Sequence, residues 1–288
     1  MSWEKISSKH LPELIHFLLP FEYRAVSFTS RLKNTLFTHP GERKHACFVY
    51  REDNSGHIIS AVLVTPAGLY LPVFTDKYPS SFLIDETFRR EVSNFTGKIH
   101  SFIGTEQDVL LLEKILRAHP KNTIHYRLMT LETQTPLNHK QYLVQNEIVI
   151  RKAQKKDAPK LFPLQKGYEL EEVIIKPEHF RDKICMNFLR YNIRNQIIFF
   201  ASCKDIPIAK AGTNGLGFDY CQLGGVYTLP EFRNKGISTS LVAFLTDFII
   251  REKKKITLFV KESNIPALRV YNKLNYQPRC GYKVSYFF

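Results

Sequence analysis

The stretch Tyr220-Cys-Gln-Leu-Gly-Gly-Val-Tyr227 and the turn Arg233-Asn-Lys-Gly-Ile-Ser238 decide how the second half of the chain folds. The first stretch reads as a strand, but a glycine pair weakens a strand and favours a bulge. After the turn, apolar residues recur at steps of three and four, which is typical of an amphipathic helix. These apolar positions are Ile237, Leu241, Phe244, Leu245, Phe248 and Ile249.

A second strand and a shorter helix follow. Ile256–Val260 is an apolar run that predicts a buried strand, and Asn264 is a suitable cap for the helix after it. Strand, helix, strand and helix in this order predict a βαβα unit with a parallel strand pair at its centre. A bulge at the Gly224-Gly225 pair would separate the two strands and open a slot in the sheet.

The turn before the long helix can bind an anion. The first turn of a helix has free backbone N–H groups and a partial positive charge. Gly236 allows a ligand to approach the backbone closely, and Arg233 and Lys235 add positive charge. The arrangement suits a pyrophosphate, although an ordinary strand–helix turn containing glycine explains the same residues.

Asn264 and Tyr271 lie seven residues apart and therefore on one face of the predicted short helix. Each residue also has a simpler explanation: capping of the helix alone accounts for Asn264, and a place in the core alone accounts for Tyr271. Beside a slot, the same two side chains can contact a ligand.

Residues 146–288 resemble the GNAT N-acetyltransferase superfamily, which binds acetyl-CoA. The turn at 233–238 is similar to its pyrophosphate motif R/Q-x-x-G-x-G/A, and residues 264–276 are similar to its motif N-x-x-A-x-x-L-Y-x-K-x-G-F. Three departures are Ser238 for Gly or Ala, Val270 for Leu, and Asn275-Tyr276 for Gly-Phe. The resemblance implies an α/β fold with a mixed sheet, the acyl-CoA N-acyltransferase fold.

The resemblance also implies roles for individual residues. The backbone N–H groups of the turn would hold the CoA pyrophosphate; its members are Arg233, Asn234, Lys235, Gly236, Ile237 and Ser238. A strand edge at Val226, Tyr227 and Thr228 would pair with the pantetheine arm, and the Val226 N–H would stabilise the developing oxyanion. Asn264 would hydrogen-bond the pantetheine. Tyr271 would protonate the departing thiolate.

The sequence indicates the general base less clearly than it indicates the residues that would bind the coenzyme. The attacking amine must lose a proton, which usually goes to a carboxylate or through water. Within Tyr168-Glu-Leu-Glu-Glu172, Glu169 and Glu172 are candidates, because this segment would border the substrate side of the fold. A solvated acidic turn is the alternative interpretation.

The first half, residues 1–145, faintly resembles a second and degenerate GNAT domain, with the acetyltransferase domain at 146–288. Strands are predicted at 46–50, 58–64, 69–74 and 123–131, with a helix at 107–117. Residues 104–107 take the place of the phosphate turn but lack its basic residues, and Thr105 or Asp108 suits a helix cap better. We expect this half not to bind CoA, and instead to wall the acceptor pocket or support the fold.

Composition narrows the functional classes. The chain of 288 residues has a net charge of +14, and residues 146–288 hold 24 basic and 13 acidic side chains, or +11. The basic residues are scattered, with no recognisable helix for reading a duplex, so we expect no nucleic-acid partner.

Five widely spaced cysteines and no H-x-x-x-H pair predict buried thiols and no metal site. Without a signal segment or an apolar run of about 20 residues, we expect no membrane partner and a cytoplasmic location.

Three functional classes remain, and the third of them is the nucleic-acid binder that the scattered basic residues disfavour. The first is an enzyme that transfers acetyl from acetyl-CoA to a primary amine, on a small molecule or an amino-terminal group, by direct attack in a ternary complex. The second is a catalytically silent module that binds CoA and regulates another process, in which Tyr271 is only part of the core. The sequence leaves the acceptor and the oligomeric state undetermined.

Overall fold

The computed structural model describes residues 3–35, 45–51, 56–75, 86–133, 148–174 and 177–288. The strands of the first half are β1 (Trp3–Lys5), β2 (Ala46–Arg51), β3 (Ile58–Val64), β4 (Leu69–Phe74), β5 (Ser101–Thr105) and β6 (Asn122–Leu131). Its α-helices are α1 (Leu11–Leu18), α2 (Glu22–Thr35), α3 (Glu86–Phe95) and α4 (Glu106–Leu116).

The second half repeats this series. Its strands are β7 (Ile148–Lys152), β8 (Ile198–Cys203), β9 (Ile206–Leu216), β10 (Tyr220–Thr228), β11 (Lys255–Lys261) and β12 (Gln277–Tyr286). Its α-helices are α5 (Ala158–Tyr168), α6 (Asp182–Asn195), α7 (Ile237–Arg251) and α8 (Ile265–Lys273), with a π-helical turn at Glu169–Val173 after α5. In the described part of the chain, no helix is both long and apolar enough to cross a membrane.

All these strands form a single sheet in the order β1-β2-β3-β4-β5-β12-β6-β11-β10-β9-β8-β7. The sheet is symmetric: each strand from β1 to β6 has a counterpart from β7 to β12, and the counterparts occupy the same positions when counted from the opposite edge. The β4–β5 and β10–β11 pairs are parallel, and the other neighbours are antiparallel. A parallel pair needs a crossover connection, which α3 and α7 provide. The predicted mixed α/β sheet is confirmed.

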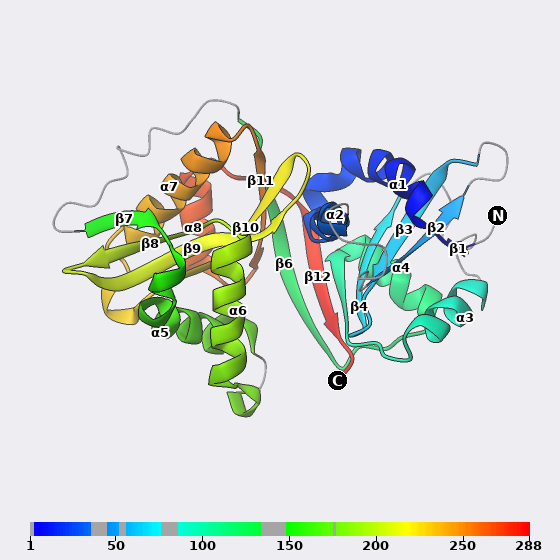
Figure 1. Cartoon of the computed structure of the whole chain (residues 1–288), viewed down its shortest axis with the longest axis horizontal. Coiled ribbons are helices and arrows are strands. Elements are labelled where there is room, and N and C mark those ends of the chain that lie inside the picture. The colour runs from blue at the N-terminus through cyan, green and yellow to red at the C-terminus, as the bar shows by residue number, and fades with distance from the viewer. Residues whose placement is uncertain (1–2, 36–44, 52–55, 76–85, 134–147, 175–176) are drawn as a thin grey trace.

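Each half gives its last strand to the sheet of the other half. β6 lies between β11 and β12, and β12 lies between β5 and β6, so the two strands meet at the centre (Figure 1). Ile256–Lys261 of β11 pairs with the first-half segment Tyr126–Leu131. The proposed domain boundary at 145/146 falls in 134–147, outside the described residues, so that division stays a prediction.

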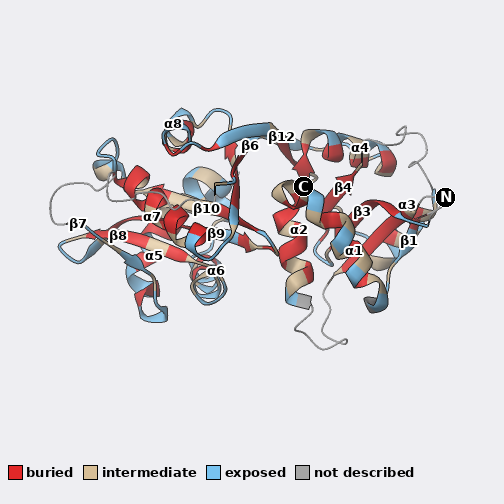
Figure 2. Cartoon of the chain, turned by 90° about the horizontal axis from the view of Figure 1, so that it is seen from above, coloured by how far each residue is buried: buried red, intermediate tan, exposed pale blue. Residues whose placement is uncertain are grey.

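Helix α2 connects the halves through polar contacts as well. The Glu22 carboxylate is fully buried and accepts the backbone N–H groups of Phe218, Asp219 and Tyr220 at 2.6, 2.7 and 3.2 Å. One turn further along, the Ser27 hydroxyl donates to Gln222 Oε1 at 3.1 Å. The α2 helix therefore packs on the β9–β10 hairpin, and Figure 2 shows it in the middle of the molecule.

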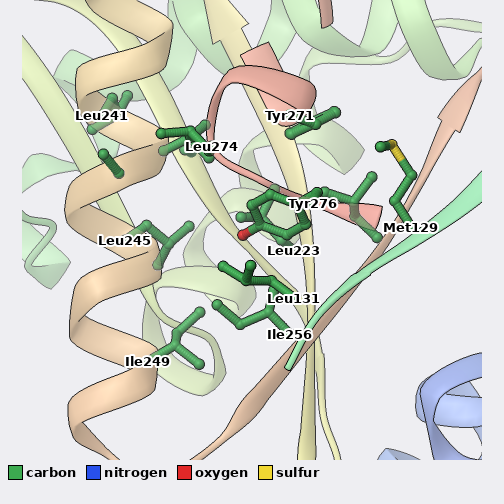
Figure 3. Packing of buried hydrophobic residues seen from close by; sticks show 14 of the residues in the cluster. Met129, Leu131, Leu223, Leu241, Leu245, Ile249, Ile256, Tyr271, Leu274 and Tyr276 are labelled. Carbon is green, nitrogen blue, oxygen red and sulfur yellow. The ribbon is translucent and has the colours of Figure 1, made fainter. Parts of the chain in front are cut away.

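The core of the second half forms around α7. Leu241, Leu245 and Ile249 are fully buried, as the sequence periodicity predicts, and pack toward β10 and β11 (Figure 3). Leu131 and Met129 of β6 belong to the same cluster, so the exchanged strand completes this core. The Tyr276 hydroxyl finds a partner in Thr246 Oγ1 at 2.7 Å, which allows a phenol to be fully buried there.

All five cysteines are free thiols. Cys47, Cys185 and Cys221 are buried, whereas Cys203 and Cys280 are half-buried. The expectation of buried thiols is therefore confirmed for three of the five.

Candidate active site

The sheet opens between β10 and β11. The two strands pair only where Tyr220, Cys221 and Gln222 lie opposite Lys255, Ile256 and Thr257. Beyond this point β10 continues along β9 to Thr228, and β11 continues along β6 to Lys261. The facing edges of β10 and β11 are thus separated over their carboxyl-terminal halves, and the slot predicted from the sequence is confirmed.

A bulge in β10 accompanies this separation. The register with β9 shifts between Gly224 and Tyr227, and Gly225 has a φ of +63°, a conformation that favours glycine. Gly224 packs against Asn214, whose amide nitrogen lies 2.1 Å from the point where a Cβ would stand. The positive φ requires glycine at 225, whereas a side chain at 224 would displace the Asn214 amide; the predicted bulge is confirmed.

Two polar side chains, the buried Lys210 and the half-buried Tyr168, hold the bulge. The Lys210 Nζ on β9 donates to the Gly225 carbonyl at 2.8 Å and lies 4.6 Å from the Tyr168 ring centroid. Burial lowers the pKa of Lys210 to about 7, against the attraction of Glu169. Burial raises the pKa of Tyr168 to about 12; Glu172 adds to the rise, and a hydrogen bond from the Gly225 backbone opposes it. The bulge is thus fixed through both its N–H and its carbonyl group.

Two cavities lie along the slot and share lining residues. The larger has a volume of about 520 Å³ and is bounded by the β10 bulge, β11, α8, and the helices α2 and α6. The smaller, of about 190 Å³, lies between the bulge, the turn before α7 and α8. Glu172, Val226, Asn264, Ala267 and Tyr271 line both. One passage therefore leads from the turn before α7 to the space between the two halves.

The turn before α7 keeps the features needed for anion binding. Gly236 occupies the cap position with a φ of +75°, and among the described residues no side chain caps this helix. Asn234 is also left-handed, with a φ of 59°, and residues 233–236 are exposed. Ile237 is buried in the core, and Ser238 lines the smaller cavity. The first N–H groups of α7 therefore point out of an accessible turn.

The two basic side chains of this turn are placed differently. The Arg233 guanidinium holds both carboxylate oxygens of Glu171 at 3.0 and 2.8 Å and donates to the Thr228 carbonyl at 3.0 Å. The Tyr227 hydroxyl also donates to Glu171, at 2.8 Å. Lys235 Nζ lies 5.1 Å from the Phe232 ring centroid. Glu171, which sequence reasoning passed over, is thus the acidic residue that meets the phosphate turn.

Tyr271 lies where the two cavities join. Its ring is 6% exposed and packs edge-on against Tyr276, with centroids 5.7 Å apart. Its hydroxyl makes no hydrogen bond with the described residues, unlike the Tyr276 hydroxyl beside it. Burial raises the pKa of Tyr271, so the phenol keeps its proton at neutral pH. A buried phenol with a free O–H at a cavity wall can donate a proton to a ligand.

Asn264 and Glu172 form a polar pair that lines the same two cavities as Tyr271. Asn264 Oδ1 accepts the Ala267 N–H at 3.1 Å, which makes it the cap of α8, and its Nδ2 donates to Glu172 Oε1 at 3.1 Å. The other Glu172 oxygen pairs with Lys261 Nζ at 3.1 Å. The π-helical turn therefore reaches both sides of the slot, through Glu171 to the α7 turn and through Glu172 to β11 and α8.

Glu169 lies on a different side of the same turn. Its Oε1 accepts from Gln165 Nε2 at 2.9 Å, and it interacts with Cys185 and Lys210. Burial, with the nearby Glu169 charge, raises the pKa of Cys185 to about 12. Of the two candidate bases, the structure brings Glu172 to the cavities, and Glu169 lines neither of them.

The first half is built differently at the related place. Thr105 caps α4 by accepting the Asp108 N–H at 3.2 Å, as the sequence suggested. Placing residues 104–107 at the phosphate turn was wrong, however, because α3 and not α4 connects the parallel strands β4 and β5. By connectivity Thr105 matches Asn264, and the counterpart of the phosphate turn includes residues 76–85, outside the described residues.

Comparisons with known proteins agree with this architecture. The model of the FR47-like protein family matches residues 210–286, which run from β9 to the end of β12. Among solved structures, a Drosophila protein has a TM-score of 0.66 at 14% identity, covering 99% of this chain and 98% of that one. No curated protein matches the sequence.

Two further solved structures carry a family name. An acetyltransferase of the GNAT family from Colwellia psychrerythraea has a TM-score of 0.57 at 11% identity, with all of both chains covered. A tandem GNAT protein from the clavulanic acid biosynthesis pathway has a TM-score of 0.60 at 10% identity, covering 98% of this chain and 97% of that one. The chain therefore has the GNAT fold over its whole length, and the fold predicted from the two motifs is confirmed.

Proposed function

We propose that the protein is an N-acetyltransferase that moves an acetyl group from acetyl-CoA to a primary amine, on a small molecule or an amino-terminal group. The observation that carries the proposal is the opening of the sheet beyond Gln222 and Thr257. One end of the opening adjoins an uncapped helix N-terminus, and a free tyrosine hydroxyl lies in its wall. The combination suits a long ligand with a diphosphate at one end and a reactive thioester near the other.

The residues along the slot would bind the coenzyme in sequence. The N–H groups of residues 233–238 would hold the diphosphate. The free edge of β10 at Val226, Tyr227 and Thr228 would pair with the amides of the pantetheine arm. Arg233 would exchange Glu171 for phosphate oxygens, because its side chain is 42% exposed and lies at the turn. Asn264 would turn its amide from Glu172 to the pantetheine.

The chemical step would be direct attack in a ternary complex. The amine nitrogen forms a bond to the acetyl carbon, the carbon–sulfur bond breaks, and the Val226 N–H stabilises the negative oxygen between these events. The sulfur leaves with the bonding electrons and takes the proton of the Tyr271 hydroxyl. The proton of the attacking nitrogen goes to a carboxylate, directly or through water.

Glu172 is the better candidate for that carboxylate. It lines both cavities and lies close enough to Tyr271 to help raise the pKa of that phenol. Glu169 remains the second candidate and would need a water chain past Lys210. We keep the cytoplasmic location as a prediction.

A catalytically silent CoA-binding module is the alternative function, and two measurements separate it from an enzyme. Calorimetry with coenzyme A tests the slot, and release of free thiol from acetyl-CoA with a panel of amines tests the chemistry. We expect Tyr271→Phe to lower kcat by about 10²–10⁴-fold with little change in coenzyme affinity, because only the proton donor is lost.

Tyr276→Phe is the matched control. It removes a neighbouring buried hydroxyl that binds Thr246, so it should destabilise the fold modestly and leave kcat near the wild-type value. Tight coenzyme binding without turnover of any amine would favour the silent module. No binding of coenzyme A would remove both functions.

A further inference from the structure

Arg31 places a positive charge on the wall of the larger cavity. It extends from α2 of the first half, and its Nη1 donates to the Ser27 carbonyl one turn earlier, at 2.7 Å. A guanidinium has five N–H donors, so one carbonyl leaves most of them unused. Within the described residues, no carboxylate lies at ion-pair distance from it. Its pKa is lowered because the side chain is largely withdrawn from water.

The other charges of this cavity compensate each other. Among the described residues, the charged side chains that line it are Arg31, Glu172 and Lys261. Glu172 and Lys261 form an ion pair, with their atoms 3.1 Å apart. Arg31 therefore leaves the cavity with one uncompensated positive charge.

The remaining walls are neutral. They carry hydroxyl and amide groups, such as Ser30 and Asn34, and aromatic rings, such as Phe259 and Tyr191, the last of which lies near Arg31. A single guanidinium among neutral groups matches one carboxylate, which it can bind through two parallel hydrogen bonds. A phosphate of charge near −2 would call for a second cation.

We infer that the acceptor is an amine that also carries a carboxylate and an apolar body, and that Arg31 binds the carboxylate. This inference rests on the proposed function, because it assigns the larger cavity to the acceptor. Arg31 would then be a specificity-determining residue supplied by the first half to a reaction carried out in the second half.

Matched amines test the inference. Phenylalanine and phenethylamine differ only in the carboxylate, and phosphoethanolamine offers a phosphate in its place. We expect kcat/KM to be highest for phenylalanine. Arg31→Gln should lower that value by about 10–100-fold, the size of a charged hydrogen bond, and leave phenethylamine unchanged. Arg31→Lys should restore part of the loss, since an ammonium keeps the charge but not the bidentate geometry.

A binding measurement gives a readout independent of turnover. N-acetylphenylalanine and N-acetylphenethylamine, as product analogues, are titrated calorimetrically into the protein loaded with coenzyme A. The carboxylate compound should bind more tightly to the wild type and lose about 10-fold or more in Arg31→Gln. Arg194→Gln on α6 is the matched control, because it removes an exposed arginine that does not line the cavity.

The outcomes separate the inference from the proposed function. Coenzyme binding with no preference for the carboxylate compound, in turnover or in titration, would overturn the inference alone. A preference for phosphoethanolamine would overturn the inference that the acceptor carries a carboxylate, and would leave Arg31 as a site for a different anion. Failure to bind coenzyme A would remove the proposed function and this inference with it.

Discussion

The two halves contain the same parallel strand pair, and the two pairs differ in what lies along their separated edges. In the first half, β4 and β5 pair at Leu69 and Tyr70 opposite Ser101 and Phe102, and then separate as β10 and β11 do. The Asp108 carboxylate accepts the Phe74 N–H at 3.1 Å, and the Arg24 guanidinium donates to the Phe74 carbonyl at 2.8 Å. In the first half, side chains thus form hydrogen bonds with the backbone groups at the separated edge of β4.

The ion pair that closes the first half is itself buried. Arg24 Nη1 and Asp108 Oδ2 are 3.0 Å apart, and the two side chains are 10% and 4% exposed. In the second half the corresponding edge of β10 borders two cavities, and Arg233 and Glu171 are each more than 40% exposed. This topology therefore creates an opening in either half. Whether the opening becomes a binding site depends on whether the chain fills it with its own charged groups.

Breaking the closed half should have the largest effect on stability. Asp108→Ala leaves the Arg24 charge buried and unpaired and removes the acceptor for the Phe74 N–H. We expect the free energy of unfolding in urea to fall by about 3–5 kcal/mol. Calorimetry should show unchanged coenzyme affinity in the folded protein, because the second half keeps its slot.

The double variant Arg24→Met, Asp108→Leu is the control for this prediction. It removes both charges together, so it should be less destabilising than Asp108→Ala alone. A double variant as unstable as the single one would show that packing, and not the unpaired charge, accounts for the loss.

Breaking the open half should change binding more than stability. Gly236→Val places a β-branched side chain at a φ of +75°, which costs about 1–2 kcal/mol and shifts the N–H groups of the turn. We expect coenzyme affinity, measured by calorimetry, to fall by about 10–100-fold, since hydrogen bonds to a charged group are lost.

Gly56→Val gives the same strain in the first half. Gly56 has a φ of +69° and no atom within 4 Å of the added Cβ, so the variant should lose similar stability and keep its coenzyme affinity. Equal losses of affinity in the two variants would contradict a specific role for the turn at 233–238.

The second-half elements were predictable because their signals are local. The period of α7, the glycine pair in β10 and the turn at 233–238 each depend on residues close together in the sequence, and all three appear as expected. The exchange of β6 and β12 was not predictable in this way. Strand pairing between Tyr126 and Tyr282 joins residues far apart in the chain, and neither strand's own pattern names its partner.

The sequence also did not indicate the roles of three residues with ionisable side chains. Lys210 lies on β9, yet nothing in its neighbourhood in the sequence shows that the side chain turns inward to the Gly225 carbonyl. Glu171 and Arg31 likewise gain their roles from elements brought together by folding: the phosphate turn for one, and the cavity between the halves for the other. Sequence spacing located the motifs, whereas the polar groups that complete the site come from other segments.

Lys210 is a further difference between the halves, because β3, the first-half counterpart of β9, has no charged residue between Ile58 and Val64. The pKa of Lys210 is about 7 in the folded protein and near 10.4 when unfolded. Between these values only the unfolded chain holds the proton, so Lys210 makes stability rise with pH. Lys210→Met should flatten the rise by up to about 1.4 kcal/mol per pH unit in urea unfolding from pH 7 to 9. Ile208→Val, on the same strand, should lower stability equally at each pH; parallel curves for Lys210→Met and wild type would contradict a lowered pKa.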